Sequence, residues 1–234
     1  MREEFPVGRN FYMVRHGQTV DNVKNIVSGY ASDTKLTELG KQQAIALQDV
    51  VSKLDPPVTK VITSEMSRTI KTAELICKAS ALRKLPITQD IGINERIYGE
   101  AEGMLEKDRM ALKKKNGSIP GEELKEVLRV RTIRAVAETL KDKKAVPLFV
   151  THGGNIRRII ENTLGIDISF QSIPNCSLFE FIAPKEKGDK WKVNVVGLGD
   201  NKQLTRQPFA EIKPIARAMR SIRSSAPREL GKSL

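Results

Sequence analysis

Short apolar runs alternate with segments of helical periodicity along most of this chain, and this alternation limits the possible folds more than any other feature. Residues 10–14 form an apolar run that predicts a buried strand, whereas residues 36–54 carry apolar side chains at helical spacing behind Thr37, a typical N-cap residue. The same patterns predict further strands at 58–63, 145–151, 176–182 and 191–196, and further helices at 67–79, 122–140 and 155–164. Such alternation is typical of an α/β fold. We therefore expect a three-layer sandwich with a mostly parallel central sheet flanked by helices.

Residues 91–120 do not follow this alternation. They are rich in charged residues and glycine, and they show no regular periodicity. In a parallel sheet, functional residues gather where the strands end. We expect residues 91–120, called the cap segment below, to form a small cap over the carboxyl edge of the sheet.

The composition excludes several classes of protein. With 234 residues and 39% hydrophobic residues, the chain is long and apolar enough to bury a core, which excludes wholesale disorder. No apolar run approaches the roughly 18 residues of a membrane span, and acidic residues and a proline occupy the start, where a signal peptide would be apolar. Two cysteines make neither a disulfide framework nor a zinc cluster, so we expect a reducing, cytoplasmic location.

Both histidines of the chain follow predicted strands and precede glycine. His16 stands in Arg-His-Gly, and His152 stands in Thr-His-Gly-Gly. A neutral imidazole is a nucleophile near pH 7, and glycine beside it would let a ligand approach the backbone. Arg15 presents a planar fork that suits phosphate oxygens. The pattern predicts chemistry on a phosphoryl group, against the alternative that a lone histidine only makes structural hydrogen bonds.

Five blocks in order resemble the histidine phosphatase superfamily, in its phosphoglycerate mutase-like branch. They are Arg-His-Gly-Gln-Thr-Val-Asp-Asn at 15–22, residues 29–44, Ser-Glu-Met-Ser-Arg-Thr-Ile-Lys-Thr-Ala at 64–73, Ile-Asn-Glu-Arg-Ile-Tyr-Gly at 93–99 with Glu102 and Gly103, and Thr-His-Gly-Gly at 151–154. Met66 and Thr69 are mild departures from the family pattern.

The resemblance implies a role for each matched residue. His16 would be the nucleophile that becomes phosphohistidine, and Glu95 would donate a proton to the leaving alcohol and later take one from water. The residues expected to surround the phosphoryl group are Arg15, Asn22, Arg68 and His152, with Thr19 and Gly153 beside them. Arg15, Arg68 and a partly charged His152 would supply positive charge, as phosphoryl transfer requires. No His/Asp cluster has metal-ligand spacing, so we expect neither a metal nor another cofactor.

The resemblance leaves the reaction open between hydrolysis and mutase-type transfer. It implies a long insertion before the second histidine in sugar-phosphate mutases, but only 57 positions separate Glu95 from His152 here. This spacing favours a phosphatase that acts on a small phosphorylated metabolite. The local pattern at 93–99 leans toward the mutases. Two further functions stay open, namely a protein phosphatase and a non-catalytic binding member of the family.

The cations of the cap segment allow two interpretations of how the substrate binds. They are Lys107, Arg109, Lys113, Lys114 and Lys115. They could bind a second phosphate or a carboxylate of the substrate, but exposed charge on a loop is the favoured interpretation.

The net charge of +12 is uneven, because the last 34 residues carry eight Lys and Arg against two Glu. We divide the chain into a catalytic domain at 1–200 and a basic C-terminal extension at 201–234. Within the extension an apolar stripe at helical spacing consists of Ile212, Ile215, Met219 and Ile222. It could dock on the catalytic domain, or it could bind an anionic membrane or a protein partner. Nucleic acid is the least favoured partner, and the sequence leaves the oligomeric state unknown.

Overall fold

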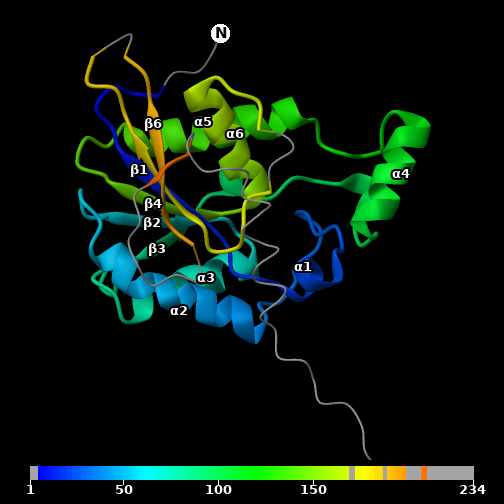
Figure 1. The fold of residues 1–234 in the computed structure, drawn as a ribbon, viewed down its shortest axis with the longest axis horizontal. Helices are drawn as coiled ribbons and strands as arrows, with labels where there is room; N and C mark the ends of the chain where they lie inside the picture. The colour runs from blue at the N-terminus through cyan, green and yellow to red at the C-terminus, as the bar shows by residue number, and fades with distance from the viewer. Residues whose placement is uncertain (1–4, 169–171, 187–188, 199–206, 210–234) are drawn as a thin grey trace, which may run out of the picture.

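A central sheet organises the chain, whose computed structural model describes residues 5–168, 172–186, 189–198 and 207–209 (Figure 1). Within these residues the sheet has seven strands in the order β3-β2-β4-β1-β5-β6-β7. The strands are β1 (Phe11–Arg15), β2 (Lys60–Thr63), β3 (Ile87–Gln89), β4 (Pro147–Thr151), β5 (Leu178–Ile182), β6 (Lys192–Gly197) and β7 (Gln207–Pro208). The four contiguous strands β3, β2, β4 and β1 are parallel, and β5, β6 and β7 continue the sheet in antiparallel pairs. The prediction of an α/β fold with a mostly parallel sheet is confirmed.

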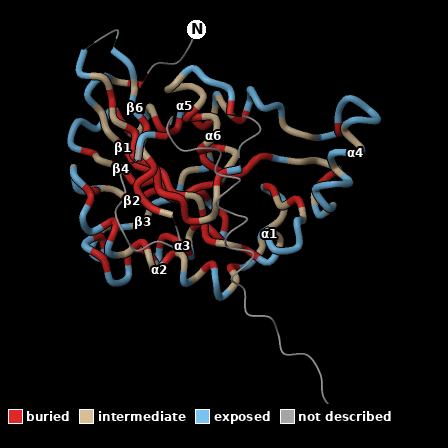
Figure 2. The backbone as a smooth tube through the Cα atoms, in the orientation of Figure 1, coloured by how far each residue is buried: buried red, intermediate tan, exposed pale blue. Residues whose placement is uncertain are grey.

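Helices cover both faces of this sheet, which gives the three predicted layers (Figure 1). Helices α2 (Glu38–Ser52) and α3 (Ser67–Lys78) pack on one face, and α5 (Lys125–Leu140) and α6 (Gly153–Leu164) pack on the other. The alternation of side chains along β1 produces this division, because Phe11 and Met13 enter the core under α5 and α6 whereas Tyr12 and Val14 enter the core under α2 and α3. Figure 2 shows the buried backbone running through the sheet between these layers.

Local sequence signals account for some of the helix ends. Thr37 is the N-cap of α2, and its hydroxyl accepts a hydrogen bond from the Gly40 amide at 2.9 Å. Helix α6 ends at Gly165, whose φ of 67° lies in the left-handed region that glycine tolerates. The predicted helix at 122–140 begins slightly later, at Lys125.

The cap segment is more regular than the sequence predicted. It contains α4 (Glu106–Asn116) and two short 3₁₀ turns, at Ile91–Ile93 and Gly99–Ala101. All 11 residues of α4 are at least partly exposed, and the helix projects from the body of the molecule (Figures 1 and 2). A helix without a buried face has no apolar stripe, so its periodicity is weak in the sequence. The expectation of an irregular segment was therefore wrong for 106–116.

Two glycines allow the loop after β1 to lie directly against the start of α2. A Cβ atom on Gly40 would lie 2.7 Å from the backbone nitrogen of Gln18 and closer still to its carbonyl oxygen. A Cβ atom on Gly17 would in turn meet the backbone of Gly40. The glycine after His16 thus permits a contact between two backbones, and the approach of a ligand at this position stays a prediction.

Part of the sequence analysis concerns residues that lie outside the described ones. The predicted amphipathic helix at 212–222 belongs to this part, so docking on the catalytic domain, membrane binding and partner binding all stay predictions. In the described part of the chain, no helix has both the length and the apolar character that crossing a membrane requires.

We predict that Gly40→Ala destabilises the protein although alanine is the better helix former. The added Cβ would overlap backbone atoms that cannot rotate away, so the free energy of unfolding should fall by about 1–3 kcal/mol. Denaturant titration measures this change. Gly153→Ala is the matched control, because a Cβ there has no neighbour closer than 3.5 Å. Equal stability of the two variants would contradict the role of Gly40.

Candidate active site

The candidate site lies where three parallel strands end at the same edge of the sheet. Arg15 is the last residue of β1, Ser64 follows β2 and His152 follows β4. The backbone amide of His16 donates to the carbonyl of Thr151 at 2.9 Å, which joins the first and last of the predicted blocks. Strand order thus brings together residues that are far apart in the sequence.

A cavity of about 140 Å³ opens at this edge. Six residues of its lining belong to the predicted site, namely Arg15, His16, Thr19, Asn22, Arg68 and Glu95. The other lining residues are Ile26, Val27, Ser28, Thr34, Tyr98 and Glu106. His152 lies behind His16 and Gly153 lies behind Arg15, so neither belongs to the lining.

His16 is held in one tautomer. Its Nδ1 lies 2.8 Å from the carbonyl oxygen of Gly17, and since a carbonyl only accepts, Nδ1 carries the proton. The other nitrogen, Nε2, then has a free lone pair. Burial, followed by the charges of Arg15 and Arg68, holds the pKa of His16 well below its usual value. The imidazole is therefore neutral near pH 7 in the free protein.

His152 packs edge-on against His16, with ring centroids 5.3 Å apart, and is fully buried. Its Nε2 lies 2.8 Å from the hydroxyl of Ser64. Its Nδ1 lies 3.9 Å from Oε2 of Glu95 and has no hydrogen-bond partner among the described residues. Burial and then the charge of Arg68 lower the pKa of His152 well below its usual value, so the expectation of a partly charged imidazole was wrong for the free protein.

The site contains two arginines, of which Arg68 is buried and Arg15 is partly buried. Arg68 is 2% exposed, and its guanidinium donates to the carbonyls of Ser32 at 2.8 Å and Gly29 at 3.1 Å. Arg15 donates from Nη1 to the carbonyl of Ile173, whereas its buried Nε has no partner in the described part of the chain. Desolvation by burial lowers the pKa of Arg15 to about 10, so both groups stay charged at neutral pH.

Thr19 and Asn22 form a capping box around α1 (Val20–Lys24). The Thr19 hydroxyl accepts from the Asn22 amide, and Oδ1 of Asn22 accepts from the Thr19 amide, both at 3.2 Å. Asn175 donates to the same Oδ1 and to the carbonyl of His16, both at 3.0 Å. Because Oδ1 accepts two hydrogen bonds, the donor Nδ2 of Asn22 remains available for the cavity.

Glu95 lies beside His152 and lines the cavity together with His16. Its Oε1 accepts from the backbone amide of Arg96 at 2.9 Å, and a Cβ on Gly154 would lie 2.6 Å from this oxygen. The second glycine of Thr-His-Gly-Gly therefore makes room for a carboxylate. Gly153 begins α6 beside Arg15, and its predicted role in binding substrate stays a prediction.

The sequence analysis gave no role to several residues that position the site, although two of them, Ser64 and Glu102, stand in the matched blocks. Asn175 and Ser64 orient Asn22 and His152, and Glu102 joins the cap segment to the loop that Arg68 holds, since it accepts from the amide of Gly29 at 2.9 Å. Their partners lie tens of residues away in the chain, so local patterns could not assign these roles.

No group of three or more metal-ligating side chains occurs among the residues that the structure describes. The metal-independent mechanism stays a prediction.

Comparisons with known proteins agree on one family. The sequence model of the histidine phosphatase superfamily (branch 1) matches residues 11–197. A broad-specificity phosphatase of Saccharomyces cerevisiae is 32% identical over 157 residues, which cover 64% of this chain and 68% of the relative. A protein of Salmonella choleraesuis named probable phosphoglycerate mutase is 31% identical over 184 residues, which cover 71% of this chain and 81% of the relative.

Solved structures share the fold. The alpha-ribazole phosphatase of Shigella flexneri superimposes with a TM-score of 0.68 at 20% identity, over 85% of this chain and 99% of that one.

We predict that both histidines titrate below pH 6.5 in the folded protein. An imidazole in the unfolded chain has a pKa of about 6.5, so below that pH the unfolded chain binds more protons and unfolding is favoured. Stability is therefore fully present above about pH 6.5 and falls as the pH is lowered. An NMR titration of the two imidazoles, together with thermal unfolding from pH 8 to 5.5, tests both statements. Imidazole midpoints at or above 6.5 would contradict the prediction.

Proposed function

The chain belongs to the histidine phosphatase superfamily (branch 1), and from this membership we propose that it hydrolyses phosphomonoesters of small metabolites through a phosphohistidine at His16. A cytoplasmic location, inferred from the two free cysteines, is part of the same proposal. The coarser conclusion, an enzyme of phosphatase or mutase type, follows from the family.

The tautomer of His16 carries the proposal. The hydrogen bond from Nδ1 to the Gly17 carbonyl leaves the Nε2 lone pair free on a neutral ring that lines the cavity. A carbonyl acceptor also favours the charged form of the imidazole once a phosphoryl group is bonded to Nε2. The same contact thus prepares the nucleophile and stabilises the intermediate.

Arginine cations support phosphoryl transfer at this position. Arg15 and Arg68 flank His16, and the unpartnered Nε of Arg15 is a donor without an acceptor among the described residues of the site. Asn22 adds its Nδ2. Fixed donors in a site that excludes water stabilise charge on the equatorial oxygens without reorganisation.

The reaction proceeds in two steps in this proposal. Nε2 of His16 attacks phosphorus, the P–O ester bond breaks, and the carboxylic acid of Glu95 gives its proton to the leaving oxygen. The carboxylate of Glu95 then takes a proton from water, the oxygen of that water bonds to phosphorus, and the P–N bond breaks to release phosphate and a free His16. Glu95 ends protonated, as it began.

Hydrolysis is favoured over transfer to a second metabolite. Between Glu95 and His152 the structure places one projecting helix, α4, before α5 and β4, so little chain is available for a large cap. The named phosphatases among the relatives point the same way. The mutase-named relative and the pattern at 93–99 keep phosphoglycerate mutase-type transfer as the second candidate.

We predict that His16→Ala lowers kcat on 4-nitrophenyl phosphate by at least about 10³-fold, because the nucleophile is lost. When the wild type reacts with phosphorus-labelled substrate and the reaction is stopped rapidly without acid, the protein should carry an acid-labile phosphohistidine. The variant should carry none. Lys78→Ala, on the far end of α3, is the control for folding and should retain both activity and label. Equal, slow release by wild type and His16→Ala would refute catalysis at His16. Phosphate transfer to an added phosphoglycerate, in excess of release to water, would favour the mutase.

We predict that Glu95→Gln affects substrates according to their leaving group. Glycerol 3-phosphate releases an alkoxide that needs a proton, so kcat/KM should fall by about 10²–10⁴-fold. 4-Nitrophenyl phosphate releases a stabilised phenolate, so its kcat/KM, which reports the first step, should fall by about 10-fold or less. Glu126→Gln changes an exposed carboxylate of α5 and serves as the control. An equal fall on both substrates would show that Glu95 is not the proton donor.

A further inference from the structure

The cavity continues beyond His16 toward the cap segment. At this end its lining consists of Ile26, Val27, Ser28, Thr34, Tyr98 and Glu106. Within the described lining the cations are Arg15 and Arg68, which flank His16 and are assigned to the phosphoryl group. The part of the cavity left for the rest of the substrate therefore offers hydroxyl groups and one carboxylate.

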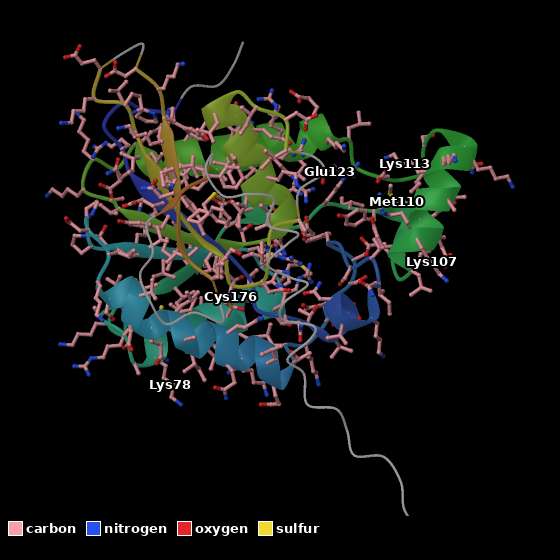
Figure 3. All side chains as sticks on the ribbon, viewed as in Figure 1. Lys78, Lys107, Met110, Lys113, Glu123 and Cys176 are labelled. Atoms are coloured by element: carbon pink, nitrogen blue, oxygen red, sulfur yellow. The ribbon has the colours of Figure 1, made fainter. Side chains whose placement is uncertain are left out.

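Three cations of the cap segment are paired with one carboxylate. Glu122, whose side chain is 5% exposed, forms ion pairs with Nη1 of Arg96 at 3.1 Å, with Nη1 of Arg109 at 3.2 Å and with Nζ of Lys113. Two of these cations, Arg109 and Lys113, are among those that the sequence offered for a second phosphate. Figure 3 shows Lys107, Met110 and Lys113 along α4, which carries these groups.

Arg109 has each of its nitrogens engaged. Besides the contact to Glu122, its Nε donates to Oε2 of Glu106 at 2.9 Å and its Nη2 donates to Oε1 at 2.5 Å. These hydrogen bonds raise the pKa of Arg109. The guanidinium also lies 5.4 Å from the ring centroid of Tyr98, which further fixes its position.

Binding of a second anionic group of the substrate beside these residues would be unfavourable. The group would lie beside the carboxylate of Glu106, or it would have to displace Glu106 or the buried Glu122 from Arg109 and leave a carboxylate without its partner. A hydroxyl group faces no such cost, because Ser28, Thr34 and Tyr98 supply hydroxyls that both donate and accept.

We propose that the enzyme takes monophosphate esters of small, uncharged, hydroxyl-bearing alcohols, and that Glu106 and Glu122 select against esters with a second phosphate or a carboxylate. This inference rests on the proposed function. It assigns to Glu106 and Glu122 the determination of specificity, since they neutralise the cations that could otherwise bind the second anion.

Two matched substrate pairs test the proposal in the full-length protein. Glycerol 3-phosphate and 3-phosphoglycerate differ by a CH₂OH in place of a carboxylate, and fructose 6-phosphate and fructose 1,6-bisphosphate differ by one phosphate. We expect the wild type to show at least a 10-fold higher kcat/KM for the member with a single anionic group in each pair. Equal values, or preference for the second member, would overturn the proposal.

The variant Glu106→Gln tests the carboxylate that lines the cavity. The side chain of Glu106 is half exposed, so the fold should tolerate this change. It should raise the ratio of kcat/KM for 3-phosphoglycerate over glycerol 3-phosphate by about 3- to 10-fold, because Arg109 gains donors for the carboxylate. Glu126→Gln is the matched control, since Glu126 receives the same Nε and Nη2 contacts from Arg129 three residues later on α5. The control should leave the ratio unchanged, and an unchanged ratio in Glu106→Gln would remove that residue from the proposal.

Failure of this inference is distinguishable from failure of the proposed function. If 4-nitrophenyl phosphate is hydrolysed through His16 but the paired substrates show no selectivity, only the substrate class is wrong. If wild type and His16→Ala release phosphate equally slowly from 4-nitrophenyl phosphate, the proposed function itself fails.

Discussion

The buried guanidinium of Arg68 and the partly buried guanidinium of Arg15 lie close to two imidazoles, and the properties of the site follow from this juxtaposition. Burying a cation is unfavourable unless acceptors replace water. The carbonyls of Ser32 and Gly29 do so for Arg68, but Arg15 keeps a buried Nε without a partner in the described residues. In the proposed function, a phosphoryl dianion would supply acceptors and negative charge to both arginines. The same cations help to lower the pKa values of His16 and His152, so the groups that would bind the substrate also keep the nucleophile unprotonated.

Backbone carbonyls, which cannot change their charge, hold the functional side chains in place. Gly17 orients His16, Ile173 receives Arg15 and the loop at 28–32 receives Arg68. These carbonyls belong to loops that leave the sheet edge, and the close backbone contact at Gly40 fixes one of them. The positions of these side chains therefore depend on main-chain packing, in which Gly17 and Gly40 leave no room for a Cβ atom.

The sequence was informative wherever a local pattern corresponds to a local structure. Thr37 and Gly165 bounded their helices, and the two histidines followed strands whose ends share an edge in any parallel sheet. It was uninformative where a residue acts through a distant partner, as Asn175 does on Asn22 and Ser64 on His152. Helix α4 was missed because it buries no face, and the neutral state of His152 was missed because burial is a property of the whole fold.

The charge of the chain acts at two different ranges. A net charge of +12 attracts phosphorylated molecules over distances of about 10 Å at ordinary ionic strength, whatever else they carry. In the proposed specificity, selection among them depends on contacts of about 3 Å, where Glu106 and Glu122 neutralise Arg109 and Lys113. Long-range attraction and short-range selection thus depend on different charges. Long-range attraction accelerates encounter with anions in general, whereas short-range selection would act on the part of the substrate that does not react. A positively charged surface is for this reason compatible with a cavity whose described lining has no cation to spare for a second anionic group.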